Sequence, residues 1–221
     1  MSSSVLIDYL AELSPKNDWI LSVGDKDLAL AQSKTKDRPN THAFKFDVTD
    51  EMQRLSEISN ADLVISMLPA HMHVDVAKQC IALKKHMVTA SYISKEMQEL
   101  DENAKKAGVV IMNEIGVDPG IDHMSAMKVL DSIRDKGGKI LQFESFTGGL
   151  PAPSSDDNPW HYKFAWNPRN VVLAGSGGAV KFKQEGTYKY IPYHNVFRRT
   201  ERIEIPEYGL FEGYALSLIH I

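Results

Sequence analysis

The stretch NEIGVDPGIDH, residues 113–123, places acid–base side chains in a polar turn at the end of an apolar run. GVVIM precedes this stretch, and Asp118 stands in the turn before a proline and a glycine. A carboxylate in such a turn can bind an amine or relay a proton, and a histidine can transfer protons near neutral pH. Asp118 is therefore the first catalytic candidate, and His123 is the second.

Each of these candidates also has a structural interpretation. Asp118 could cap the helix expected after it, and Asp122 suits the first turn of that helix. His123 could pack or form a structural hydrogen bond. Tyr92, which follows an earlier apolar run, could bind a substrate or could be an aromatic residue at a domain edge. The residues alone leave these alternatives open.

Short apolar runs alternate with helical patterns of roughly ten residues throughout 1–136. This alternation is typical of a doubly wound parallel α/β sheet, which binds ligands at the carboxyl ends of its strands. The expected strands cover residues 18–25, 42–50, 61–69, 86–94 and 109–116. The expected ligand-binding rim consists of Gly24-Asp25, Asp47-Val48, Ser66–Pro69, Thr89–Tyr92 and Val117–Pro119.

A dinucleotide-binding sheet normally starts with a strand and a glycine-rich turn, whose N–H groups hold the pyrophosphate. Asp25 fits the acidic position that follows about 20 residues later and binds the ribose hydroxyls. Counting back places the glycine turn near residues 1–6, which read MSSSVL and contain no glycine. The sequence therefore predicts a doubly wound sheet whose first strand and glycine turn are missing.

The pattern changes near residue 137. Alternating apolar residues at 139–150, 170–193 and 198–213 predict strands of an α+β domain with a largely antiparallel sheet. Residues 151–170 form an irregular aromatic stretch, interpreted as a loop on the substrate side. We expect two incomplete domains, 1–125 for dinucleotide binding and 126–221 for substrate binding.

The composition excludes several classes of function. A net charge of −4 argues against a nucleic-acid partner, because no basic surplus exists to offset phosphates. No apolar stretch approaches the roughly 20 residues of a membrane span. The single cysteine, Cys80, has no disulfide partner, and the N-terminus lacks the basic region of a signal peptide. These features predict a cytoplasmic protein without membrane contact, and no metal site is expected.

Several stretches resemble the glutamate-forming saccharopine dehydrogenase family, which also occurs as the C-terminal part of bifunctional aminoadipic semialdehyde synthase. They are ISMLPAHMH, HMVTASYIS, NEIGVDPGIDHMSAMKVLDSI, GGLPAPSSDDNPWHYKFAWNPRNVVLAG and PYHNVF. The resemblance implies a Rossmann domain followed by a substrate domain. It also implies a reaction that interconverts saccharopine with glutamate and aminoadipate semialdehyde by hydride transfer with a nicotinamide cofactor.

The resemblance further implies roles for individual residues. The implied cofactor contacts are Asp25, Lys26, Asp47, Val48, Leu68, Ala90, Ser91, Val117, Asp118, Pro119 and Asn167. Ser91, Tyr92 and Asp118 are the implied substrate contacts. We take Asp118, Tyr92 and His123 as the catalytic candidates.

The expected cofactor is NAD or NADP. A carboxylate at position 25 would accept from a ribose 2′-hydroxyl and repel a 2′-phosphate, which slightly favours NAD. Lys26 could attract a phosphate instead, and family members that use NADP typically have an arginine near this position. Saccharopine is the expected small-molecule partner, and a homodimer is compatible with this interpretation.

Three departures from the family pattern leave alternatives to an active enzyme. The glycine turn is absent, and Ser217 stands where the family has an arginine that binds a substrate carboxylate. The later helical part of the family, with a second carboxylate-binding arginine, is also expected to be missing. One alternative is a truncated, non-catalytic fragment or an interaction remnant. Another is a related polyamine-forming reductive condensation enzyme, against which the stretch DDNPWHYKF weighs.

Overall fold

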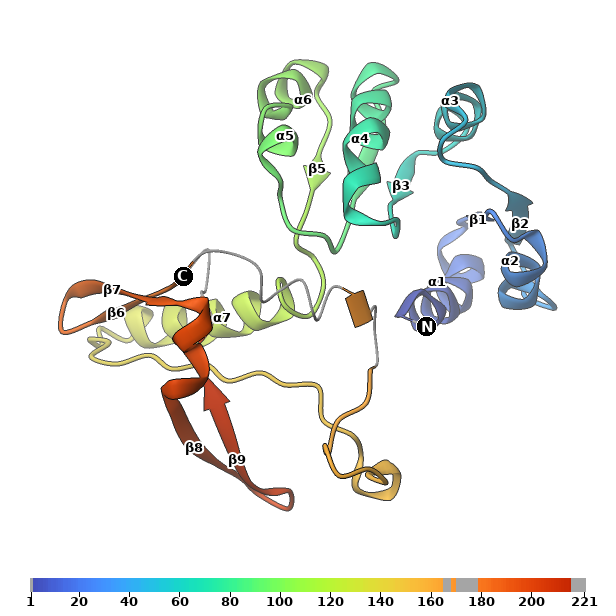
Figure 1. Ribbon diagram of the computed structural model, residues 1–221. Coiled ribbons are helices and arrows are strands. Elements are labelled where there is room, and N and C mark those ends of the chain that lie inside the picture. Colours follow the sequence, from blue (N-terminus) through green and yellow to red (C-terminus); the bar gives the residue numbers. More distant parts are fainter. Residues whose placement is uncertain (1, 165–167, 170–178, 216–221) are drawn as a thin grey trace. The chain divides into compact units, whose positions relative to one another are not determined.

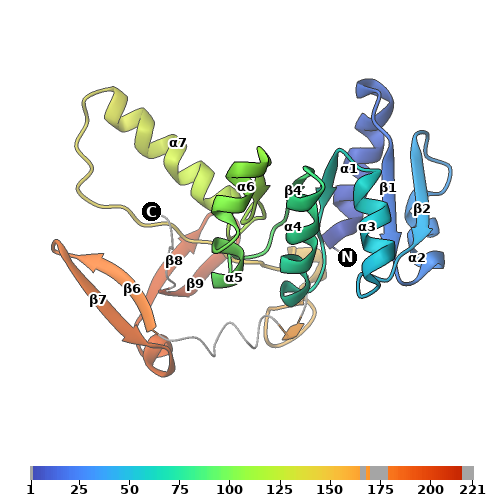
Figure 2. The same cartoon turned by 90° about the horizontal axis from the view of Figure 1, so that it is seen from above.

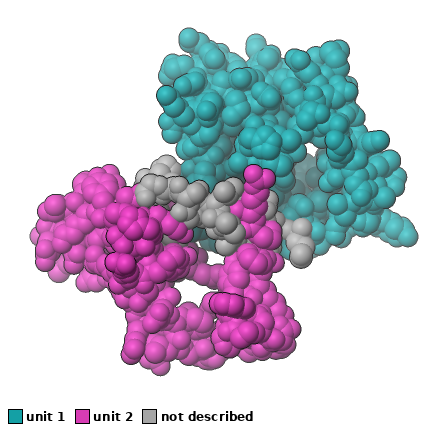
Figure 3. All heavy atoms as spheres, viewed as in Figure 1, with its two compact units in different colours: residues 1–122 teal, residues 123–221 magenta. Residues whose placement is uncertain are grey.

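The computed structural model describes residues 2–164, 168–169 and 179–215. The chain divides into two compact units, residues 1–122 and 123–221, which Figure 3 colours separately. Each unit has its own secondary structure and is described by itself.

The first unit alternates helices with parallel strands (Figure 1). Its helices are α1 (Ser2–Asn17), α2 (Leu28–Thr35), α3 (Glu51–Ser59), the 3₁₀ helix η1 (Ala70–Met72), α4 (His73–Ala82), α5 (Lys95–Gln98) and α6 (Asp101–Ala107). Its strands are β1 (Leu21–Asp25), β2 (Thr41–Lys45), β3 (Leu63–Ile65), β4 (His86–Val88) and β5 (Ile111–Met112).

The five strands form two parallel sheets. β1 pairs with β2, which lies beside it in Figure 2, and the other three strands pair in the order β3-β4-β5. The described part of this unit starts with a helix, and no described strand pairs with both β1 and β3. The predicted α/β class with parallel strands is confirmed. The strands are shorter than expected: β2, β3, β4 and β5 end earlier, because their expected last residues form the loops at the carboxyl edge, whereas β1 begins later, at Leu21.

Local side-chain contacts explain where several helices begin and end. The carboxylate of Asp50 accepts hydrogen bonds from the N–H groups of Met52 and Gln53 and so caps α3. Gly108 ends α6 with a φ of 70°, a left-handed conformation that glycine adopts at little cost. A turn at residues 99 and 100 separates α5 from α6.

The core of the first unit lies between α3, α4, β4 and α5. Its buried members are Ile58, Val76, Ala77, Cys80, Met87 and Met97. Burial raises the pKa of the Cys80 thiol to about 11, so this thiol stays protonated near neutral pH. Cys80 is therefore a core residue with little nucleophilic character.

The second unit contains two antiparallel hairpins. Helix α7 (Ile121–Asp135) leads into it, and the other described elements are η2 (Pro153–Ser155), β6 (Ala179–Gln184), β7 (Thr187–Pro192), η4 (Tyr193–Arg198), β8 (Thr200–Ile205) and β9 (Gly209–Tyr214). β6 pairs with β7, and β8 pairs with β9 (Figure 1). The antiparallel character agrees with the expectation, although the described strands form two separate two-stranded sheets.

The strand expected over residues 139–150 is absent, so this prediction is wrong. The whole segment lacks regular structure, and the side chain of Leu141 is 86% exposed. A strand needs a partner for its backbone groups, but each described strand of the second unit pairs within its own hairpin. Apolar alternation alone does not supply that partner. The expected loop over residues 151–170 is irregular in much of its described part, which also contains η2.

Among the described residues, no helix combines the length and the apolar character needed to cross a membrane.

Candidate functional site

Asp25 and Lys26 lie at the carboxyl end of β1, beside the residues that follow β2. Oδ1 of Asp25 accepts a hydrogen bond from the N–H of Asp27 at 2.8 Å, which tightens the turn into α2. Nζ of Lys26 lies 3.2 Å from Oδ2 of Asp47. Two neighbouring strand ends are therefore joined by an exposed ion pair at the edge where a dinucleotide sheet binds its adenosine half.

Asp47 is a strongly acidic carboxyl group. Its Oδ1 accepts from the Thr49 hydroxyl at 2.6 Å and from the Thr49 N–H at 3.0 Å. These two hydrogen bonds, followed by the contact with Lys26, lower the pKa of Asp47 to about 2. Asp47 therefore remains ionised at every physiological pH.

Val48 and Leu68 pack against the core and support the loops on which they lie. The Val48 carbonyl accepts a hydrogen bond from the guanidinium of Arg54, which is itself buried. Leu68 lies in the turn from β3 to η1. These contacts with the core and with Arg54 fix the loops after β2 and β3, which form part of the expected ligand-binding rim.

The loops after β4 and β5 are joined by hydrogen bonds. The N–H of Glu114 donates to the Ser91 carbonyl at 3.1 Å, and the N–H of Ile93 donates to Oε1 of Glu114 at 3.0 Å. A Cβ built on Gly116 would lie 3.2 Å from the Cβ of Ala90, so the two loops approach closely there. The contacts bring Ala90, Ser91 and Tyr92 next to the turn that carries Asp118.

That turn is compact and depends on glycine. The N–H of Gly116 donates to the Pro119 carbonyl at 2.9 Å, and the N–H of Ile121 donates to the Gly116 carbonyl at 3.0 Å. Gly120 has a φ of 147°, and a Cβ there would lie 2.2 Å from the Gly116 oxygen. Pro119 is buried, whereas Val117 and Asp118 face outward. The turn therefore presents a carboxylate and an apolar side chain at the strand ends.

Tyr92 is surrounded by negative charge. Partial burial raises the pKa of its phenol, and the carboxylates of Asp118, Glu114 and Asp122 raise it further. The residue is 57% exposed and so remains accessible to a ligand. Its hydroxyl is therefore protonated near neutral pH and can donate a hydrogen bond to a ligand.

Two further predicted site residues are His123 and Asn167. His123 lies in the first turn of α7 and belongs to the second unit. Asn167 lies outside the described residues. Their roles remain predictions.

The sequence reasoning missed the contacts of three residues: Glu114, Ser66 of the predicted rim, and His73 at the start of α4. Glu114 stands inside the quoted stretch NEIGVDPGIDH, but its contact with Ile93 joins positions 21 apart. Ser66 Oγ lies 2.8 Å from Nδ1 of His73, and both residues are buried. A polar residue directly after a strand and a histidine at the start of the next helix were the available signals.

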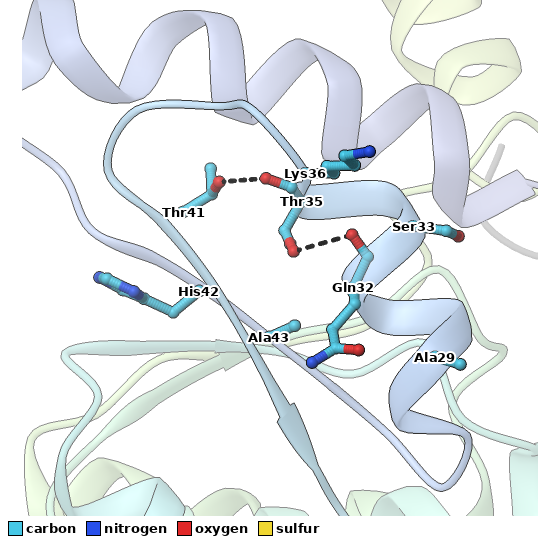
Figure 4. Close-up of a pocket in the computed structure, with 8 residues that line it drawn as sticks. All are labelled: Ala29, Gln32, Ser33, Thr35, Lys36, Thr41, His42 and Ala43. Atoms are coloured by element: carbon cyan, nitrogen blue, oxygen red, sulfur yellow. Dashed lines mark hydrogen bonds between the residues drawn. The ribbon is translucent and has the colours of Figure 1, made fainter.

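A hollow of about 480 Å³ lies between α2 and β2, away from these loops (Figure 4). It is lined by Ala29, Gln32, Ser33, Thr35, Lys36, Thr41, His42 and Ala43. Thr41 is the first residue of β2, so the hollow lies at the amino end of that strand. Ligands of doubly wound sheets bind at the opposite edge, and we do not assign the site to this hollow.

Within the described ranges, no group of three or more His, Cys, Asp or Glu side chains could hold a metal ion.

Two family comparisons together cover nearly the whole chain. Residues 3–112 match the family described as "Saccharopine dehydrogenase NADP binding domain". Residues 116–220 match the family described as "Saccharopine dehydrogenase C-terminal domain".

Curated relatives show the same similarity. The chain is 40% identical over 201 residues to alpha-aminoadipic semialdehyde synthase of Arabidopsis thaliana, which covers 91% of this chain and 19% of the relative. It is 38% identical over 203 residues to saccharopine dehydrogenase [NADP(+), L-glutamate-forming] of Saccharomyces cerevisiae, covering 92% of this chain and 44% of the relative. The chain therefore spans less than half the length of each relative.

A solved structure is similar as well. The apo histidine-tagged saccharopine dehydrogenase (L-Glu forming) from Saccharomyces cerevisiae matches with a TM-score of 0.81 at 38% identity, covering 94% of this chain and 46% of that chain. Because both halves of the sequence and the fold agree with the same proteins, the chain belongs to the saccharopine dehydrogenase family.

Proposed function

We propose that the protein to which this chain belongs is an oxidoreductase acting on the CH–NH group of saccharopine in lysine metabolism. It interconverts saccharopine with L-glutamate and 2-aminoadipate 6-semialdehyde. The proposal is carried by the loops after β4 and β5, whose hydrogen bonds bring Tyr92 next to the turn that holds Asp118. In this proposal residues 1–125 bind the dinucleotide and residues 126–221 bind the substrate.

The side chains at these loops suit the chemistry of a secondary amine flanked by carboxylates. The carboxylate of Asp118 would bind the substrate amine or relay its proton, and the protonated hydroxyl of Tyr92 would donate a hydrogen bond to the substrate. Ser91 would make a further substrate contact. When bound, the nicotinamide ring accepts the hydride, and the loops must orient the carbon that gives it up.

We propose NADP as the cofactor. The expectation of NAD from Asp25 is not supported by the name of the matching family or of the Saccharomyces cerevisiae relative, both of which specify NADP. Lys26, 79% exposed in its side chain, supplies a cation beside the position where the adenosine ribose would lie. The side chains at the ends of β1, β2, β4 and β5 fit the adenosine and nicotinamide ends of a dinucleotide.

The test compares two proteins. One is the 221-residue chain. The other, called here the extended protein, is the Saccharomyces cerevisiae relative with its matching segment replaced by this chain. Formation of the reduced cofactor is followed by absorbance with saccharopine and either NADP or NAD, and the unaltered relative serves as the positive control.

We expect saccharopine-dependent reduction of NADP by the extended protein. A folded extended protein that binds NADPH but does not oxidise saccharopine would contradict the proposed substrate. Competition by carboxynorspermidine under that outcome would favour the polyamine-forming alternative. Activity in the extended protein but not in the 221-residue chain would mean that this chain alone is a non-catalytic fragment.

A further inference from the structure

Glu114 connects the loop after β5 to the loop after β4. Its N–H donates to the carbonyl of Ser91 at 3.1 Å, and its Oε1 accepts from the N–H of Ile93 at 3.0 Å. Ser91 and Ile93 are the two chain neighbours of Tyr92. A single residue of one loop therefore holds the backbone on both sides of Tyr92 in the other.

The backbone of Glu114 has an unusual conformation. Its φ is 61°, in the left-handed region that residues with a side chain rarely adopt. Such a conformation persists where the surrounding contacts hold it. Here the hydrogen bonds to Ser91 and Ile93 use both the rotated N–H and the side chain, so the conformation serves the contact with the neighbouring loop.

The hydrogen bond from the Ile93 N–H to the Glu114 carboxylate is charge-assisted. A carboxylate that accepts from a backbone N–H contributes about twice as much as a neutral acceptor. Glutamine could keep the same acceptor oxygen without the charge, whereas alanine would remove it. The side chain of Glu114 therefore allows its role as a hydrogen-bond acceptor to be separated from its role as a charge.

We propose that Glu114 is a positioning residue of the saccharopine reaction, which holds the Ser91–Ile93 backbone so that the Tyr92 hydroxyl stays fixed at the substrate. The proposal rests on the proposed function. Glu114 acts through Tyr92 and does not itself contact the substrate. The pKa of the Tyr92 phenol is raised by partial burial first, then by the charge of Asp118 and next by that of Glu114.

The experiment uses E114A, E114Q and the matched control E207A. Glu207 also has a left-handed backbone, with a φ of 70°, but it belongs to the second unit and lies in the turn between β8 and β9. In the 221-residue chain, hydrogen exchange of the Ile93 amide directly measures whether its hydrogen bond to the Glu114 carboxylate is present. In the extended protein, kcat and the KM values for saccharopine and NADP report its effect on the reaction.

We expect E114A to lose protection of the Ile93 amide and to lower kcat by at least about tenfold, because small misplacements of catalytic groups have large effects on rate. The KM for NADP should not change. E114Q should keep the protection and most of kcat, and E207A should match the wild type in both measurements.

Equal activity of E114A and the wild type would overturn the role of Glu114, as would an equal loss of kcat in E114Q and E114A. A wild-type extended protein with no saccharopine-dependent activity would overturn the proposed function and the role with it. The activity of the wild-type extended protein thus distinguishes a failure of the proposed function from a failure of the role of Glu114 alone.

Discussion

Oγ of Ser66 and Nδ1 of His73 lie 2.8 Å apart, and each residue is only 3% exposed. Ser66 directly follows β3, and His73 is the first residue of α4. Their hydrogen bond therefore ties together the two ends of the turn that carries Leu68. Burial lowers the pKa of His73, and the charge of the nearby His71 lowers it further. The folded protein thus favours the neutral imidazole.

This pair predicts a pH dependence of stability. The pKa of His73 lies below 6.5 in the folded state, so the unfolded chain binds an extra proton as the pH falls. Stability should be fully present above about pH 6.5 and should decrease below it, by at most about 1.4 kcal/mol per pH unit. Urea unfolding of the 221-residue chain from pH 7.5 to 5 measures this slope.

The variant His73→Gln cannot titrate and should have a smaller slope. His42→Gln, at an exposed position on β2, is the matched control and should behave as the wild type. Equal slopes in the wild type and in His73→Gln would contradict a depressed pKa for His73.

The parallel fold of the first unit and most of its strand-end residues could be predicted because they depend on local patterns. An apolar run that ends at Asp25 or Asp47 already marks a strand and its carboxyl end. The role of Glu114 could not be predicted, since it depends on a left-handed φ and on a contact with a residue 21 positions earlier. The unpaired segment 139–150 was misassigned for a similar reason: pairing is decided by distant residues.

Thr49 should control the acidity of Asp47. Its hydroxyl and its N–H are the largest causes of the low pKa of Asp47, ahead of Lys26. Thr49→Val removes the hydroxyl and should raise the pKa of Asp47 from about 2 towards 3.8. NMR titration of the Asp47 side-chain carbon measures this change. Lys26→Met should give a smaller increase, and a larger increase in Lys26→Met than in Thr49→Val would contradict the order of causes.

The lowered pKa of Asp47 also has a consequence for stability. Because the folded pKa lies below 3.8, the contribution is present above about pH 4 and is lost as the pH falls towards 2. Asp47→Asn should therefore weaken the pH dependence of unfolding only below about pH 4. A difference confined to higher pH would be inconsistent with this cause.

Lys26 should distinguish the two cofactors in the extended protein. If its ammonium contacts the 2′-phosphate, Lys26→Met should weaken NADPH binding by about tenfold and leave NADH binding nearly unchanged, because only NADPH carries that phosphate. Cofactor fluorescence titration gives both dissociation constants. Lys78→Met, which removes an exposed lysine 3.9 Å from Asp75 on α4, is the matched control. An equal loss for NADH and NADPH would argue against a phosphate contact.

Gly120 should be the least replaceable of three glycines. Alanine there meets the Gly116 oxygen at 2.2 Å and has a φ of 147°, so Gly120→Ala should destabilise the fold by about 3 kcal/mol or more. Gly108 has a φ of 70° but nothing within 4 Å of its added Cβ, and Gly108→Ala should cost about 1–2 kcal/mol. Gly148 also has open space and an ordinary φ, so Gly148→Ala should change stability by less than about 1 kcal/mol. Urea unfolding of the three variants tests this order. Equal stabilities of Gly120→Ala and Gly108→Ala would contradict the close contact between Gly116 and Gly120 in the turn that holds Asp118.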